Sequence, residues 1–345
     1  MVSVAGADAQ ELAGTSIGFD FSDPELAGNV AAVLGEVEQR LRDTVTSADP
    51  LVTDAARHLV EAGGKRFRPL LVALGAHFGD PFGPGVVTAA TVVEMTHLAT
   101  LYHDDVMDEA AVRRGAPSAN SRWGNAVAIL IGDYLFARAA DLATELGIEA
   151  VRIQARTFSR LVHGQIAETA GPAAGEDAIE HYLRVISQKT GSLIATSARF
   201  GGMFGGAPPD QVDSLAMYGE RIGTAFQLSD DLLDIASDSD QSGKTPGTDL
   251  REGVPTLPVL YALASADTDA SAVRLREILA DGPVTDDALH EEALTLLRES
   301  AAMKRARETV RASAEQARGA LGTLPGTPAR RALEGLCDFI VQRTG

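Results

Sequence analysis

The chain has 345 residues, of which 45% are hydrophobic, and its formal net charge is −18 at pH 7. This length and apolar content predict a folded globular protein with a large core and exclude a disordered chain. The strong negative charge argues against a nucleic-acid partner, because such a partner calls for a basic face.

Residues 1–24 are rich in Gly, Ala, Ser and Asp and show no periodicity, which predicts a mobile N-terminal arm. The arm has no basic stretch followed by an apolar one, so we expect no signal peptide. We also expect no transmembrane segment, because no apolar run approaches the roughly 20 residues that a membrane span needs. The single cysteine, Cys337, allows no internal disulfide and fits a cytoplasmic location.

From residue 27 onward, apolar residues recur at steps of three and four, as in Val30, Val33, Val37 and Leu41. Similar patterns predict helices near residues 50–61, 68–79, 84–109, 123–146, 149–169, 176–204, 209–237, 255–265, 284–322 and 327–343. Gly-Gly pairs at 63–64, 201–202 and 205–206, together with several prolines, are expected to separate them. Strand signals are nearly absent, and no linker divides the chain. We therefore expect an all-α fold in which residues 25–345 form a single domain of ten or more helices.

The spacing Asp-Asp-x-x-Asp occurs twice, as Asp104, Asp105 and Asp108 and as Asp230, Asp231 and Asp234. Each cluster follows a long apolar-periodic run, so we expect both near the C-terminal ends of helices. Residues i and i+4 share one face of a helix, so the first and third aspartates of each cluster should point together. Like-charge repulsion, the helix dipole and the low helix propensity of Asp all disfavour this arrangement.

A bound cation would compensate for these unfavourable charges. Oxygen ligands suit magnesium, which takes one or two carboxylates and fills its remaining positions with water and phosphate oxygens. The clusters therefore predict a magnesium site and a phosphorylated ligand. A solvated acidic surface would explain one such cluster, but it does not explain the same spacing twice.

Several cations could meet the phosphate groups. Residues 63–69 form a compact turn, Gly-Gly-Lys-Arg-Phe-Arg-Pro, whose glycines allow close approach of the backbone. Lys65 offers a point charge and Arg68 a planar fork to phosphate oxygens. Each cation alone is typical of a solvated surface, but their occurrence with two acidic clusters in so acidic a chain favours anion binding. The other candidates are Arg113, Arg114, Lys189 with Thr190, and Lys244.

With these motifs in this order, residues 30–345 resemble the trans-prenyl diphosphate synthases, or polyprenyl synthetases. The resemblance implies an isoprenoid-synthase-type bundle of mostly antiparallel helices around a central cavity, usually a homodimer. It implies a prenyltransferase that condenses isopentenyl diphosphate with an allylic diphosphate. One departure is Val254, which stands where many members have Lys and so removes a cation at that position.

The resemblance also implies roles for residues that match the family's motifs. The catalytic set would be Asp104, Asp105, Asp108, Asp230, Asp231 and Lys189. Three magnesium ions per active site would be held by Asp104, Asp108, Asp230 and Asp234. The allylic diphosphate would contact Arg113, Lys189, Thr190, Gln227 and Lys244. Isopentenyl diphosphate would contact Lys65, Arg68, Arg114 and His97, although His97 alone would also fit as a core histidine.

Product length is expected to depend on the helix that ends at Asp104, since the growing chain must lie along it. Thr100 is one turn before Asp104 and faces the same way, and Ala99 flanks it. Short-chain members often place a bulky aromatic at one of these positions. Both residues are small here, so we expect a long-chain polyprenyl product of the quinone side-chain type, with a geranylgeranyl (twenty-carbon) product as the alternative.

Two other functions share part of the pattern. A class I terpene cyclase has the same fold and first cluster, but its second motif typically contains Asn, Ser and Glu. A non-catalytic subunit of a heteromeric synthase usually lacks the aspartate clusters. The all-Asp second cluster and the basic turn at residues 63–69 favour the synthase over both.

Overall fold

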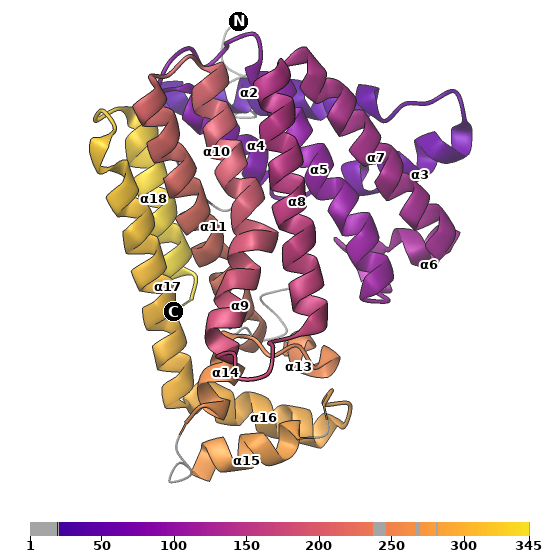
Figure 1. Ribbon diagram of the computed structural model, residues 1–345, viewed down its shortest axis with the longest axis vertical. Coiled ribbons are helices and arrows are strands. Elements are labelled where there is room, and N and C mark those ends of the chain that lie inside the picture. Colours follow the sequence, from indigo (N-terminus) through magenta and orange to yellow (C-terminus); the bar gives the residue numbers. More distant parts are fainter. Residues whose placement is uncertain (1–18, 20, 237–245, 266–269, 281, 345) are drawn as a thin grey trace, which may run out of the picture. The chain divides into compact units, whose positions relative to one another are not determined.

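Helices dominate the computed structural model, which describes residues 19, 21–236, 246–265, 270–280 and 282–344 (Figure 1). The only strands in this part of the chain are two residues long, so the predicted all-α class is confirmed. Packing divides the chain into two compact units. The first unit contains the chain up to Ser159 with Leu193–Gly219 and Ala320–Leu333, and the second contains Arg160–Ser192, Glu220–Gly319 and the chain from Glu334 on. That residues 25–345 form one domain stays a prediction. Most of the predicted arm, 1–24, lies outside the described residues.

The first unit is built around α5 (Val86–Met107), which packs against α7 (Asn125–Glu145), α4 (Phe67–Ala76) and α2 (Pro24–Thr44) (Figure 1). Two strands follow α5 and form an antiparallel hairpin, β1 (Val112–Arg113) and β2 (Ala116–Pro117). The remaining elements that lie in this unit or begin in it are α3 (Pro50–Glu61), α6 (Ala119–Trp123), α8 (Ile148–Ala170), α10 (Ser192–Phe204), α11 (Pro209–Ala236), η2 (Leu321–Thr323) and α18 (Pro328–Gln342).

Aspartate-proline pairs start two of these helices. The side chain of Asp23 accepts a hydrogen bond from the backbone N of Leu26 (3.0 Å), and Asp49 caps α3 in the same way. The proline that follows each aspartate has no N–H to leave unsatisfied in the first turn. The periodic residues of α2 are buried as expected, namely Val30, Val33, Val37 and Leu41.

Glycines allow the backbones of α4 and α10 to lie directly against each other. A Cβ added at Gly201 would lie 2.3 Å from the carbonyl oxygen of Val72, and one added at Gly75 would lie 2.9 Å from that of Ala198. The expectation that the pair 201–202 separates two helices is therefore wrong, because these glycines lie inside α10 and serve close packing.

The second unit contains a π-helix and several shorter helices. The stretch predicted as one helix over 176–204 is helical from Ala178 to Phe204, but its type changes along the way. The α-helix α9 (Ala178–Ile186) is followed by the π-helix η1 (Ser187–Gly191), and α10 then begins at Ser192. The stretch 284–322 is interrupted at Ser300, whose backbone is extended and whose hydroxyl caps the next helix at Met303. The other helices are α13 (Thr248–Glu252), α14 (Leu257–Leu263), α15 (Ala270–Leu279), α16 (Asp287–Glu299) and α17 (Ala301–Ala320). Among the described residues, no helix combines the length and the apolar character needed to cross a membrane.

Candidate active site

The predicted site residues divide between the two units, and the first aspartate cluster lies in the first unit, at the end of α5. Asp104 is half-buried in the last turn, and Asp108 is the exposed C-cap. Asp105 is fully buried and accepts a hydrogen bond from Nε of Arg113 at 2.5 Å. Burial raises the pKa of Asp105, and Arg113 offsets only part of that effect. The three aspartates therefore differ: the first and third are accessible at one helix end, and the second holds an arginine.

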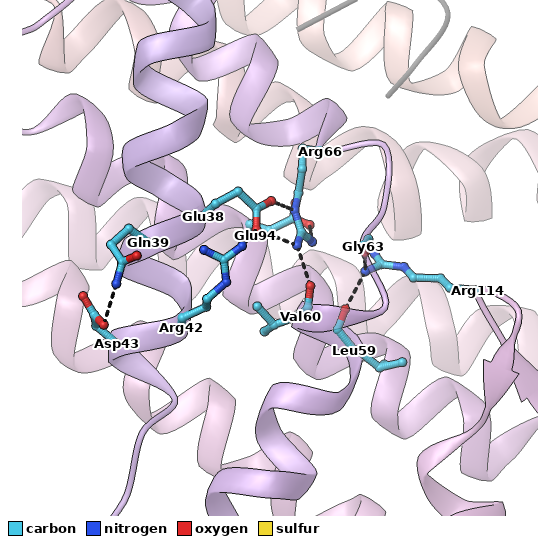
Figure 2. Close-up of polar contacts among 10 residues, drawn as sticks. All are labelled: Glu38, Gln39, Arg42, Asp43, Leu59, Val60, Gly63, Arg66, Glu94 and Arg114. Atoms are coloured by element: carbon cyan, nitrogen blue, oxygen red, sulfur yellow. Dashed lines mark hydrogen bonds and ion pairs between the residues drawn. The ribbon is translucent and has the colours of Figure 1, made fainter. Parts of the chain in front are cut away.

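The β1–β2 hairpin carries the two arginines that follow this cluster. Arg114 and Gly115 turn the chain with positive φ angles of 54° and 76°. Nη1 of Arg114 donates to the carbonyl oxygen of Leu59 at 2.9 Å and to that of Gly63 (Figure 2). A Cβ at Gly64 would lie 2.7 Å from the guanidinium carbon of Arg114, so the second glycine of the basic turn is required for this contact.

The basic turn joins α3 to α4 in a left-handed conformation. Gly63, Gly64 and Arg66 have φ angles of 79°, 140° and 46°. For Arg66, as for any residue with a side chain, this conformation costs about 1–2 kcal/mol. The Arg66 side chain is buried and pairs with Glu38 and Glu94 (Figure 2). Within the predicted set, Lys65 is exposed and Arg68 is half-buried.

Arg68 and His97 share an electropositive part of the first unit. Burial lowers the pKa of Arg68 to about 10, with the charge of Glu94 acting in the opposite direction. Nε of Arg68 is buried and has no hydrogen-bond partner among the described residues. Burial lowers the pKa of His97 well below its ordinary 6.5, and the charges of Arg68 and Arg114 lower it further. The imidazole of His97 is therefore neutral and lies near the charges of several arginines. One of them, Arg68, has an Nε–H that can donate a hydrogen bond to a ligand.

The second aspartate cluster lies in the second unit, on α11, and its three carboxylates again have different partners. Asp230 forms an ion pair with Arg343, whose guanidinium also lies 4.9 Å from the ring centroid of Phe226. Asp234 accepts hydrogen bonds from the backbone N of Thr248 and of Asp249, both at 3.2 Å.

Asp231 is the buried member of this cluster. It accepts hydrogen bonds from the hydroxyl of Tyr182 and from Nε2 of Gln227, the latter at 3.0 Å. Burial raises the pKa of Asp231 well above its ordinary value, and the neighbouring charges of Asp249 and Asp234 add to this. The middle aspartate therefore anchors side chains in the second cluster as it does in the first.

The π-helix η1 carries two more of the residues predicted to contact the allylic diphosphate, Lys189 and Thr190. The hydroxyl of Thr190 donates to Oε1 of Gln227 at 3.0 Å, which extends the chain of hydrogen bonds from Asp231. Lys189 forms an ion pair with Glu168 at 2.5 Å. Wide π-helical turns often occur at functional sites. Lys244 lies outside the described residues, and Val254 is 39% exposed.

The donor chemistry of both clusters fits magnesium. In the described part of the chain, no three Asp, Glu, His or Cys side chains converge closely enough to hold a metal by themselves. Magnesium does not need such a cage, since one or two carboxylates and the oxygens of a bound diphosphate suffice. Asp104 and Asp108 can provide this from α5, and Asp230 and Asp234 can provide it from α11.

The positions expected to set product length lie on α5. Ala99 is fully buried, and Thr100 is half-buried with its hydroxyl donating to the carbonyl oxygen of His97 at 2.7 Å. Neither side chain is bulky.

The sequence analysis did not identify several residues of these networks, namely Glu38, Glu94, Arg66, Glu168, Tyr182 and Arg343. A signal existed for Glu94, which is a carboxylate in the apolar run before the first cluster and therefore calls for a buried partner.

Comparisons with known proteins point to one family. The profile of the polyprenyl synthetase family matches residues 49–297. Nonaprenyl diphosphate synthase of Mycobacterium tuberculosis is 54% identical over 329 residues, which cover 95% of this chain and 97% of that protein. Among solved structures, this chain is similar to geranylgeranyl pyrophosphate synthase from Corynebacterium glutamicum complexed with calcium and isoprenyl diphosphate. The two sequences are 45% identical, the TM-score is 0.85, and the match covers 94% of this chain and 99% of the other. A decaprenyl diphosphate synthase from Rhodobacter capsulatus is 38% identical with a TM-score of 0.84 and covers 93% and 99%.

Proposed function

The chain belongs to the polyprenyl synthetase family, and from this membership we propose that it condenses isopentenyl diphosphate with an allylic diphosphate to make a long polyprenyl diphosphate. The observation that carries the proposal is the end of α5, where Asp104 and Asp108 are accessible in the same unit as Arg68 and His97. This reaction requires carboxylates that bind one diphosphate through metal ions and cationic side chains that bind a second diphosphate.

From the resemblance to the family, we propose that three magnesium ions bind the allylic diphosphate, with Asp104, Asp108, Asp230 and Asp234 as their carboxylate ligands. Magnesium supplies positive charge that stabilises the departing diphosphate. The chain's own contacts would be Arg113, Lys189, Thr190 and Gln227, with Lys244 as a further contact outside the described residues.

Isopentenyl diphosphate would bind beside the basic turn. Among the described residues, nothing pairs with the buried Nε of Arg68, and Arg114 is held at the end of α3 through Nη1 alone. Nε of Arg68 and Nε and Nη2 of Arg114 can therefore donate to phosphate oxygens. Lys65 would add a point charge, and neutral His97 would donate one hydrogen bond without adding charge. Once the allylic C–O bond has ionised, the resulting cation alkylates the double bond of isopentenyl diphosphate, and the departing diphosphate accepts the proton that is then lost.

A long product is the version of this function that we favour. Ala99 and Thr100, the two positions on α5 that are expected to limit product length, carry small side chains without an aromatic ring. Nonaprenyl and decaprenyl synthases are among the similar proteins. A geranylgeranyl product is the alternative, since the Corynebacterium glutamicum enzyme is also similar.

We further propose a cytoplasmic homodimer. Within the first unit, α7 exposes 43% of Ile129 and 65% of Leu130, and a second copy would remove both from water. Cys337 is buried and is the single cysteine of the sequence, so it forms no internal disulfide, which agrees with a reducing compartment. Light scattering should give twice the chain mass, and Leu130→Lys should lower it; a monomeric wild type would contradict the dimer.

One assay separates the proposed function from its competitors. The purified protein is incubated with magnesium, labelled isopentenyl diphosphate and an allylic primer, and the dephosphorylated products are chromatographed. Linear products longer than the primer support the synthase. A cyclised hydrocarbon would identify a terpene cyclase, and no product would indicate a non-catalytic subunit.

A further inference from the structure

We propose that Arg66 is a positioning residue, whose buried guanidinium holds the turn between α3 and α4 so that Lys65 and Arg68 face isopentenyl diphosphate. This inference rests on the proposed function. No motif role was expected for Arg66, although it lies between the two cations to which the resemblance gives one.

The Arg66 side chain joins three helices. Nη1 donates to Oε1 of Glu94 on α5 at 2.9 Å, and Nη2 donates to the carbonyl oxygen of Val60 near the end of α3 at 2.9 Å. Nε and Nη2 both reach the carboxylate of Glu38 on α2, the latter at 3.2 Å (Figure 2). The Arg66 and Glu94 side chains are 6% and 2% exposed, so this network is inside the protein.

This anchoring explains why Arg66 keeps a left-handed backbone. Its φ of 46° is unfavourable for a residue with a side chain, and such a conformation persists only where the surroundings determine it. Arg66 is the residue before the first turn of α4, and no side-chain hydrogen bond caps that turn. The direction in which α4 leaves the turn therefore depends on the four hydrogen bonds of the Arg66 guanidinium.

Two arginines fasten the same helix end from different sides. Arg66 binds the carbonyl oxygen of Val60, and Arg114 binds those of Leu59 and Gly63 (Figure 2). Helix C-termini leave carbonyl groups without intrahelical partners, and cationic donors satisfy them well. Lys65 follows directly in this doubly fastened turn, so its backbone position is set by both contacts.

The charge of Arg66 is neutralised inside the protein, unlike that of Arg68. Burial alone would lower the pKa of Arg66, but its hydrogen bonds to Glu38 and the charge of Glu94 raise it overall. Its Nε, Nη1 and Nη2 all donate to protein oxygens, whereas Nε of Arg68 has no hydrogen-bond partner in the described part of the chain. We therefore assign ligand binding to Arg68 and its placement to Arg66.

The test compares Arg66→Lys with Glu38→Gln. Lysine keeps the positive charge but cannot span Glu38, Glu94 and Val60 with one planar fork. The Michaelis constant for isopentenyl diphosphate should rise about tenfold, as expected for loss of charge-assisted hydrogen bonds. The turnover number at saturation and the Michaelis constant for the allylic primer should stay within about twofold of the wild type, because only one site is displaced. Glu38→Gln should act in the same direction.

Arg42→Ala is the matched control. Arg42 lies 3.7 Å from the same Glu38 carboxylate but is half-exposed and does not reach the turn (Figure 2). Its removal should leave both Michaelis constants unchanged. If Arg66→Lys does not fold, Glu38→Gln still decides the question, since Glu38 is 26% exposed and the buried Arg66–Glu94 pair remains.

Calorimetric titration with isopentenyl diphosphate and magnesium, without a primer, gives a readout that does not depend on turnover. The inference predicts a dissociation constant about tenfold weaker for Arg66→Lys. Folded variants with unchanged affinity, or with equal losses for both substrates, would overturn it. A wild type that binds isopentenyl diphosphate but makes no product would instead contradict the proposed function, while the binding comparison would still test Arg66.

Discussion

Replacing Asp108 with Asn removes a negative charge from the C-terminal cap of α5 while keeping the shape of the side chain. Asp108 is exposed, and Asp104 lies four residues earlier on the same helix face. Without a bound cation, both carboxylates are in an unfavourable place, because they repel each other and meet the negative end of the helix dipole.

The size of the effect follows from these two contributions. The i,i+4 repulsion is worth about 0.2–0.5 kcal/mol, and a charge at the wrong helix end about 0.3–1 kcal/mol. Asp108→Asn should therefore raise the free energy of unfolding of the metal-free protein by about 1 kcal/mol, or about 2 °C in melting temperature. Turnover should fall at least about a hundredfold, as when one group that stabilises transition-state charge is removed.

The assay pairs urea unfolding with turnover. Unfolding is measured without metal and again with magnesium and an unreactive allylic diphosphate, which should stabilise the wild type by about 2.7 kcal/mol at a hundred times its dissociation constant. The variant should lose most of that gain. Asp141→Asn removes an exposed aspartate that pairs with Arg138 on α7, and it should leave stability and turnover nearly unchanged. A less stable Asp108→Asn with near-normal turnover would refute the reasoning.

Three further outcomes are expected. Arg114→Ala should raise mainly the Michaelis constant for isopentenyl diphosphate, and Lys189→Ala should raise mainly that for the allylic primer, because losing a charge-assisted hydrogen bond costs about 1.5–3 kcal/mol. Equal effects of both variants on both Michaelis constants in steady-state kinetics would contradict the assignment. Ala99→Phe should shorten the product seen by chromatography, because a buried ring fills space otherwise open to isoprene units; an unchanged distribution would argue against this. Since the folded state disfavours protonated His97, the free energy of unfolding should fall as the pH drops below 6.5, and His97→Gln should weaken that fall; identical pH profiles from urea titrations would count against it.

The helical elements could be predicted because their signals are local. Apolar residues at three- and four-residue steps located α2. The same spacing rule placed Asp104 and Asp108 together at the end of α5. The π-helix η1 could not be read in this way, because its residues, Ser-Gln-Lys-Thr-Gly, include no large apolar side chain whose spacing would reveal a widened turn.

The networks behind the site could not be predicted because their partners are distant in sequence. Glu38 and Glu94 each lie 28 residues from Arg66, and Tyr182 lies 49 residues from Asp231. Helix periodicity relates only residues within a turn or two, so it cannot pair them. It separates the middle aspartate of each cluster from the other two, but it does not show that burial makes the middle one an anchor for other side chains.

The central claim is that the aspartates of both clusters are magnesium ligands for the allylic diphosphate. A crystal structure of the protein with magnesium, isopentenyl diphosphate and an unreactive allylic diphosphate analogue would test it most directly. The account predicts magnesium bound by Asp104 and Asp108 and by Asp230 and Asp234 when the allylic analogue is present, with isopentenyl diphosphate on Arg68 and Arg114. An allylic diphosphate bound away from either cluster, or clusters without metal at saturating magnesium, would contradict it.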